Sequence, residues 1–160
     1  MVPYWIVTAD ARQAHLFSCK HTPGGDLHLD LVRSLQNGHE NEHEHRRPSL
    51  LGGGERRGGV GHASAGAAPH SVSVGHEVEE EHRRFVREVK GWLHHAEREL
   101  GVEQVTVFGA SKMLGMLREM VGDLSAGVQL REGELTRLTA QELSKHPAVR
   151  KVAEASMQRK

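Results

Sequence analysis

The sequence predicts a single α/β domain in which a mixed five-stranded sheet carries helices on its faces. Apolar strand patterns precede residue 37, a long stripe with helical spacing follows residue 76, and strand and helix patterns alternate in the last third of the chain. The length of 160 residues suits one domain with one core. We expect this domain to span residues 1–149 and residues 150–160 to form a C-terminal tail.

Three strands are predicted before the first helix. Tyr4 to Ala9 is apolar on both faces, which is typical of a central strand covered from both sides. Ala14 to Cys19 is a second apolar run, expected to pair back on the first as a hairpin. After a turn at Pro23 to Asp26, the leucines of Leu27 to Leu31 alternate with polar residues and predict a third, half-buried strand.

A long amphipathic helix is predicted from about Val78 to Leu100, where apolar residues recur every three or four positions. Phe85 lies on this stripe, and we expect it to be buried against the sheet. Glu79 to Glu81 are assigned to the first turn, where the helix dipole favours carboxylates. Gly101 is placed to end the helix.

The next elements are a strand, a helix and a strand. Val105 to Phe108 predicts a buried strand, which turns sharply at Gly109 into a helix. We expect Ser111 to cap this helix, because a serine hydroxyl can accept a hydrogen bond from a free N–H of the first turn. Val128 to Leu130 is assigned to the fifth strand.

A short helix is predicted near the C-terminus. Thr139 and Glu142 have the spacing of a capping box, and Pro147 is expected to follow the end of the helix. The apolar stripe after Ala148 is weak, so we expect the chain to fray there.

Composition limits the classes of function. Lys and Arg together number 21, as do Asp and Glu, so the chain lacks the positive field that drives binding to nucleic acid by charge alone. The single Cys19 cannot form an internal disulfide, no secretory signal is recognised, and no apolar run approaches the ~20 residues that span a bilayer. We expect a cytoplasmic protein with no membrane or DNA partner; the oligomeric state stays open.

Residues 37–76 predict a long loop, because they contain no apolar periodicity at either the strand or the helix repeat. Structureless connections of more than about 15 residues are usually functional or disordered. The loop contains Gly53, Gly54 and Glu55, and nearby arginines suited to RNA phosphates, namely Arg46, Arg47, Arg56 and Arg57. The alternative is a Gly-rich loop with solvated charges.

The same loop is rich in histidine. His39, His43 and His45 alternate with glutamates, and both side-chain types can bind zinc or nickel. The spacing is not that of a closed structural site, so the alternative is weak, adventitious binding of a divalent metal. No other cofactor is expected. Outside the loop, we expect His82 and Cys19 to be packed residues rather than catalytic ones.

Several short segments occur along the chain in a characteristic order and spacing. They are Tyr4 to Ala14, Gly75-His76-Glu77, Thr106-Val107-Phe108, Leu114 to Arg118, and Leu138-Thr139. In this order and spacing they resemble the bacterial host attachment protein family, and the similarity covers nearly the whole chain to about Val149.

This resemblance implies a relation to the middle domain of the archaeal and eukaryotic peptide-chain release factor, which has a ribonuclease-H-like sheet. In that domain, a loop between the third strand and the long helix carries Gly-Gly-Gln into the peptidyl-transferase centre. The corresponding slot here holds Gly53-Gly54-Glu55 as catalytic candidates, with Glu in place of Gln. The resemblance therefore implies a ribosome- or tRNA-linked partner. The rival hypotheses are a non-enzymatic protein supporting attachment to host cells and a His-rich metal-binding protein.

Overall fold

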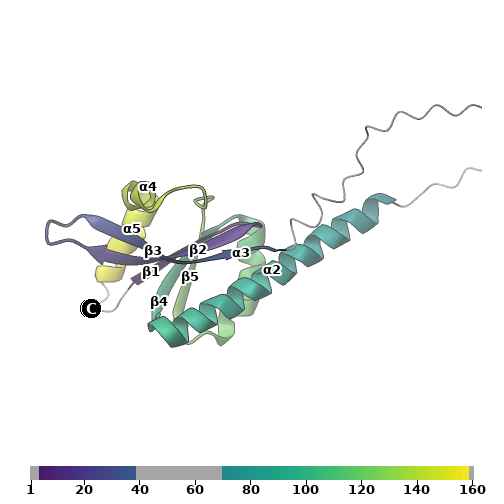
Figure 1. Cartoon of the computed structure of the whole chain (residues 1–160), viewed down its shortest axis with the longest axis horizontal. Coiled ribbons are helices and arrows are strands. Elements are labelled where there is room, and N and C mark those ends of the chain that lie inside the picture. Colours follow the sequence, from purple (N-terminus) through teal and green to yellow (C-terminus); the bar gives the residue numbers. More distant parts are fainter. Residues whose placement is uncertain (1–3, 39–69, 159–160) are drawn as a thin grey trace, which may run out of the picture.

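The computed structural model describes residues 4–38 and 70–158, which contain one five-stranded sheet with helices on both faces (Figure 1). Its strands are β1 (Tyr4–Ala9), β2 (Gln13–His21), β3 (Leu27–Gln36), β4 (Gln104–Gly109) and β5 (Gly127–Glu132). Their order across the sheet is β3-β2-β1-β4-β5. β4 is parallel to both β1 and β5, whereas β2 is antiparallel to both β1 and β3. The predicted α/β class and the mixed five-stranded sheet are confirmed.

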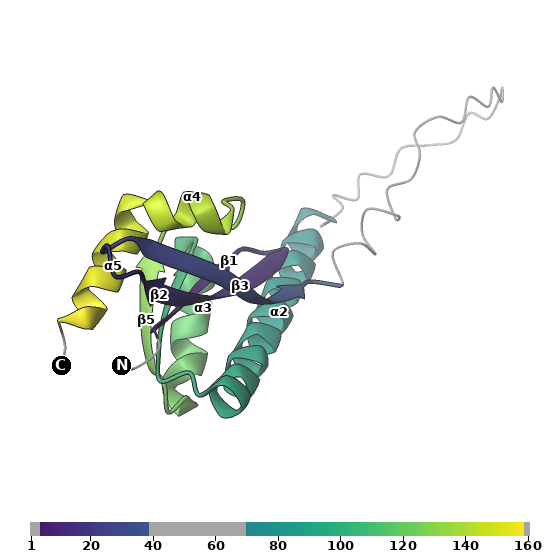
Figure 2. The same cartoon turned by 60° about the vertical axis from the view of Figure 1, so that its left-hand side comes forward.

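The helices form one layer on each face of the sheet (Figure 2). They are α2 (His70–Leu100), α3 (Ser111–Met120), the short 3-10 helix η1 (Val121–Asp123), α4 (Ala140–Lys145) and α5 (Pro147–Met157). α2 and α3 share one buried apolar cluster with the sheet, and α4 and α5 share a second cluster on the opposite face. The fold therefore has two apolar layers separated by the sheet.

β1 lies at the centre of the sheet, and all six of its residues are buried. Trp5 and Val7 belong to the cluster with α2 and α3, whereas Tyr4 and Ile6 belong to the cluster with α4 and α5. The two-sided apolar pattern of this strand correctly predicted its central position, since both of its faces are covered.

A bulge in β3 changes which face its side chains occupy. The pairing with β2 passes from Leu31 to Arg33, so Val32 is the extra residue. Leu27 and Leu29 consequently face α4 and α5, whereas Leu35 packs against the cluster with α2. The prediction that Leu31 is on the half-buried side of a regular strand is wrong. Its side chain lies at the bulge, between these two halves, and is 54% exposed.

Helix α2 begins at His70, so the predicted loop of residues 37–76 is too long at its C-terminal end. Glu79 to Glu81 consequently lie inside the helix rather than in its first turn, which contains no acidic residue. The Ser, Val and Gly residues that precede Glu77 are weak helix formers, so the sequence did not indicate that α2 starts at His70. The predicted end is confirmed: Gly101 has a φ of 66° and its N–H donates to the carbonyl of Glu97 at 3.1 Å.

The turn from β4 into α3 favours glycine, because a Cβ on Gly109 would lie 3.1 Å from the carbonyl oxygen of Ala9 in the neighbouring strand, which is a tight contact. The prediction that Ser111 caps α3 is wrong. Ser111 is the first helical residue, and the N-cap is Ala110, which makes no side-chain capping hydrogen bond. The cap position was misplaced by one residue, within the usual uncertainty of helix boundaries.

The C-terminal helices close the second face of the sheet. Thr139 and Glu142 form the predicted capping box at the start of α4, which ends before Pro147. The prediction that the chain frays after Ala148 is wrong, because α5 continues to Met157. The apolar stripe of α5 is short, but all three of its residues, Val149, Val152 and Ala153, are buried against the sheet.

Candidate functional site

The parallel strands β1, β4 and β5 end at one edge of the sheet, followed in the chain by Asp10, Ala110 and Gly133. Ligands of open α/β sheets bind outside the carboxyl ends of parallel strands. This edge of the sheet is therefore the candidate ligand-binding edge among the described residues.

The Asp10 carboxylate organises this edge by accepting three hydrogen bonds. Its Oδ1 accepts from the backbone N–H groups of Arg12 at 2.7 Å and Gln13 at 2.8 Å, which closes the β1–β2 turn. Its Oδ2 accepts from the hydroxyl of Thr136 at 2.6 Å, which attaches the segment between β5 and α4. Both carboxylate oxygens are thus engaged in holding the turn, which favours a structural role for Asp10 over that of a general base.

The start of the predicted loop is fixed to the same turn. The backbone N–H of Asn37 donates to the carbonyl of Arg12 at 2.7 Å, and its side-chain amide donates to the carbonyl of Ala11 at 3.1 Å. Asn37 is also one of the few buried polar residues, at 8% exposure. The point at which the chain leaves β3 towards residues 39–69 is therefore fixed at the carboxyl edge of β1.

A row of polar side chains crosses the sheet beside this turn. Thr8 of β1 is paired in register with His15 of β2, which is paired with Ser34 of β3. The ring Nδ1 of His15 lies 2.9 Å from the hydroxyl of Ser34, and the fully buried hydroxyl of Thr8 has no partner in the described residues. Period-2 alternation across the strands could have revealed this row.

The Ser34 and His15 pair has the spacing of a nucleophile and its base. A catalytic triad also needs a group that orients the histidine, and no carboxylate is hydrogen-bonded to His15 in the described part of the chain. The pair is exposed and links two strands, so its geometry is that of a cross-strand contact.

The sequence-predicted site residues lie outside the residues that the structure describes. This applies to the catalytic candidates, to the RNA-binding arginines and to the metal-binding histidines. These residues are Gly53, Gly54, Glu55, Arg46, Arg47, Arg56, Arg57, His39, His43 and His45. Their roles stay predictions. Within residues 4–38 and 70–158, no group of three or more His, Cys, Asp or Glu side chains is arranged to hold a metal ion.

Cys19 is not poised for catalysis. Burial in an apolar environment raises the pKa of the Cys19 thiol to about 12, which keeps it protonated and unreactive near neutral pH. Cys19 packs against the cluster with α4 and α5 as predicted, but it is half-buried rather than fully buried. His82 is half-buried on the stripe of α2.

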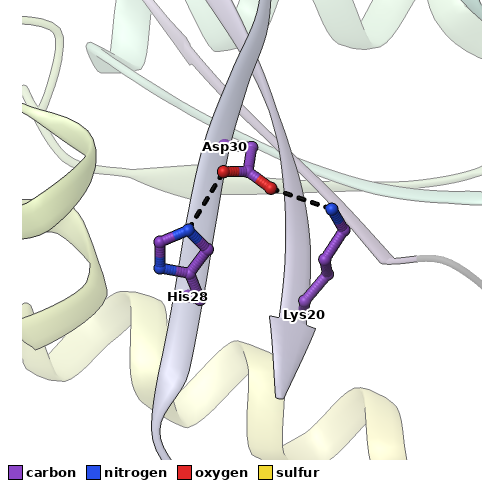
Figure 3. Close-up of polar contacts among 3 residues, drawn as sticks. All are labelled: Lys20, His28 and Asp30. Atoms are coloured by element: carbon purple, nitrogen blue, oxygen red, sulfur yellow. Dashed lines mark hydrogen bonds and ion pairs between the residues drawn. The ribbon is translucent and has the colours of Figure 1, made fainter. Parts of the chain in front are cut away.

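A second polar cluster lies on the β2–β3 hairpin (Figure 3). The Asp30 carboxylate accepts from the Lys20 ammonium at 2.9 Å and lies 3.0 Å from the Nε2 of His28. The hydrogen bond from Lys20 is the main cause of the lowered pKa of Asp30. All three side chains are at least 43% exposed, so water screens the interaction. This cluster is a solvated surface feature with a single carboxylate already shared by two partners.

No helix among the described residues combines the length and the apolar character needed to cross a membrane.

Comparison with known proteins identifies the family. The sequence model described as "Protein required for attachment to host cells" matches residues 5–146. No curated protein matches the chain.

Two solved structures resemble the fold. The archaeal translation termination factor aRF1 has 11% identity and a TM-score of 0.40, and the match covers 98% of this chain and 38% of that one. An Aquifex aeolicus member of the Ppx/GppA family has 12% identity and a TM-score of 0.38, with 83% and 36% covered. The chain thus spans less than two fifths of either protein. With the family match covering most of its length, the chain belongs to the family of proteins required for attachment to host cells.

Proposed function

We propose that this protein acts through residues 39–69 on a ribosome- or tRNA-linked partner in the cytoplasm. The observation that carries the proposal is the fixed exit of this segment from the sheet. Asn37 is buried and hydrogen-bonded to the β1–β2 turn, and α2 resumes the fold after the segment. A long insertion anchored to a rigid scaffold is the usual way in which proteins present binding residues.

The composition of the segment supports RNA as the partner. Arg46, Arg47, Arg56 and Arg57 provide planar guanidinium groups that bind phosphate bidentately, although the chain as a whole carries no net charge. Gly53 and Gly54 lie between these pairs and allow the backbone to approach an ester or phosphate closely. Glu55 adds a negative charge that opposes this approach. We therefore assign the wild-type protein a binding role and expect ester hydrolysis only from a variant in which Glu55 is replaced by Gln.

The arginine prediction tests RNA binding directly. Changing Arg56 and Arg57 to Ala should weaken binding to ribosomes or tRNA, and should reduce the slope of log affinity against log salt by about one for each phosphate that the variant no longer binds. The measurement is binding across a salt series with purified ribosomes and tRNA. A matched control is Arg150 to Ala, which removes an exposed charge from α5. Equal retention of the double variant and the wild type at every salt concentration contradicts the proposal.

The Glu55 prediction separates binding from chemistry. Glu55 to Gln recreates Gly-Gly-Gln and removes the adverse charge, so it should tighten ribosome binding and permit slow hydrolysis of a peptidyl-tRNA ester. Release of labelled peptide from loaded ribosomes is the readout. Adding Gly54 to Ala to this variant should suppress release without changing charge, because the methyl group obstructs the backbone approach. Equal binding by wild type and Glu55 to Gln argues against an RNA-facing tip.

A second candidate follows from the family description, which names a requirement in attachment to host cells. In that case the protein supports attachment without enzymatic activity, and ribosome binding is absent at all salt concentrations. The third candidate, metal binding by His39, His43 and His45, rests on sequence alone. It requires stoichiometric zinc or nickel to remain on the purified protein after dialysis.

A further inference from the structure

The N-terminal half of α2 extends past the sheet with nothing packed against it in the described residues (Figures 1 and 2). None of the side chains of residues 75–84 is buried, and Phe85, at 1% exposure, is the first buried residue of the helix. An isolated helix of this length is marginal in water, especially with Ser, Val and Gly in its first turns. The projecting part of α2 is therefore a surface that packing with a partner would stabilise.

The projecting part continues the apolar stripe of the buried part. Val78 and His82 lie at helical spacing from Phe85 and Val89, which are both core residues. Val78 is 45% exposed, making it one of the four exposed large hydrophobic residues described. The apolar stripe of α2 thus continues from the buried core onto the exposed, projecting part of the helix.

Charges beside this stripe follow a definite order along the helix. Glu77, Glu79, Glu80 and Glu81 come first, followed by Arg83, Arg84 and Arg87. Two intrahelical ion pairs are described here, Arg83 with Glu79 at 3.2 Å and Arg87 with Glu80 at 3.3 Å. Their side chains are between 41% and 58% exposed, so exchanging these partners for others costs little.

We propose that the projecting part of α2 is a homodimerisation surface that crosses the same segment of a second copy in an antiparallel direction. Reversing the segment places its acidic half against the basic half of the partner. With the two-fold axis near position 81, Glu79 of each copy lies beside Arg83 of the other, Val78 lies between His82 and Arg84 of the other, and the two Glu81 residues lie at the axis. A two-fold interface requires such self-complementarity.

The charge order also selects against other partners. A polyanion such as RNA meets the arginines but is repelled by the preceding glutamates, and a basic surface has the opposite difficulty. A parallel copy sets like charges side by side. The antiparallel copy instead places Glu79 and Arg83 of each chain beside the opposite charge of the other chain.

Sedimentation velocity of the full chain, from about 1 μM to about 300 μM, tests the proposal. The wild type should pass from monomer to dimer as its concentration rises. Val78 to Arg should weaken the association by about tenfold or more, because it places a charge in the apolar contact. Glu79 to Arg and Arg83 to Glu should each weaken self-association, since each sets like charges across the interface.

The decisive experiment is sedimentation velocity of a mixture of these two charge variants. An equimolar mixture of Glu79 to Arg with Arg83 to Glu should form a heterodimer at concentrations where neither variant dimerises alone, because the cross-chain pairs are then opposite in charge. The like charges at positions 79 and 83 within each chain remain, so an intrahelical effect cannot produce this rescue. Glu154 to Arg on α5 is the matched control and should leave association unchanged. A wild type that is monomeric throughout, or a mixture that stays monomeric, overturns the proposal.

Discussion

Phe85 is the residue at which α2 meets the core, since all preceding described side chains of the helix are at least partly exposed. Its burial was predicted from its place on the apolar stripe and is confirmed at 1% exposure. Phe85 to Ala should destabilise the fold by about 3–5 kcal/mol, through lost transfer energy and the cavity left behind. The measurement is the free energy of unfolding in denaturant. A loss below about 1 kcal/mol shows that the site collapses or that the helix packs differently.

The short helix α4 depends on its capping box. The Glu142 carboxylate accepts from the backbone N–H of Thr139 at 2.8 Å and from its hydroxyl at 2.9 Å, and these hydrogen bonds lower the pKa of Glu142. Thr139 to Ala should therefore destabilise the protein by about 1 kcal/mol. An unchanged unfolding midpoint for this variant contradicts a role for the cap.

The cap also predicts a pH dependence. A carboxyl group whose pKa is lower in the folded state stabilises the fold above its unfolded pKa, which is about 4.3 for Glu, and this contribution is lost as pH falls through the folded value. The melting temperature of Glu142 to Ala should thus be lower than that of the wild type at pH 7, and the difference should shrink below about pH 4. A difference that is constant from pH 7 to pH 3 assigns the effect to packing instead.

Elements with strong periodicity were predictable, and those decided by tertiary contacts were not. β1 and the buried half of α2 have unmistakable apolar patterns, so their type and position were correct. The start of α2 at His70 was missed, because its first turns contain weak helix formers. The length of α5 was missed, because its weak apolar stripe is stabilised by packing against the sheet. The bulge at Val32 left no signal in the sequence, since it is set by pairing with β2.

The candidate site was predictable only in part. The composition of the loop identified its Gly, Arg and His residues as candidates. These residues lie outside the described part of the chain, so their relative positions stay predictions. The anchoring of Asn37 to the β1–β2 turn was missed, because the contact joins residues 25 and 26 positions apart in the sequence. Such contacts follow from the sheet order and not from local pattern.

On the scale of the whole molecule, the scaffold and residues 39–69 are predicted to be separable. The two apolar clusters described are built from elements on either side of this segment. Replacing Pro48 to Pro69 by a short Gly/Ser linker should leave the melting temperature nearly unchanged, since the cost of loop closure depends only logarithmically on length. Loss of a cooperative transition in calorimetry shows instead that the segment is part of the core.

The same replacement provides the most direct test of the proposed function. Full-length protein and the linker variant are each mixed with purified ribosomes and sedimented through a cushion at low and high salt. The account predicts that the full-length protein sediments with ribosomes at low salt and is released at high salt, because phosphate contacts weaken steeply with salt. It also predicts that the folded linker variant stays in the supernatant under both conditions. Equal sedimentation of the two proteins, or no sedimentation of the full-length protein at low salt, contradicts a role for residues 39–69 in ribosome binding.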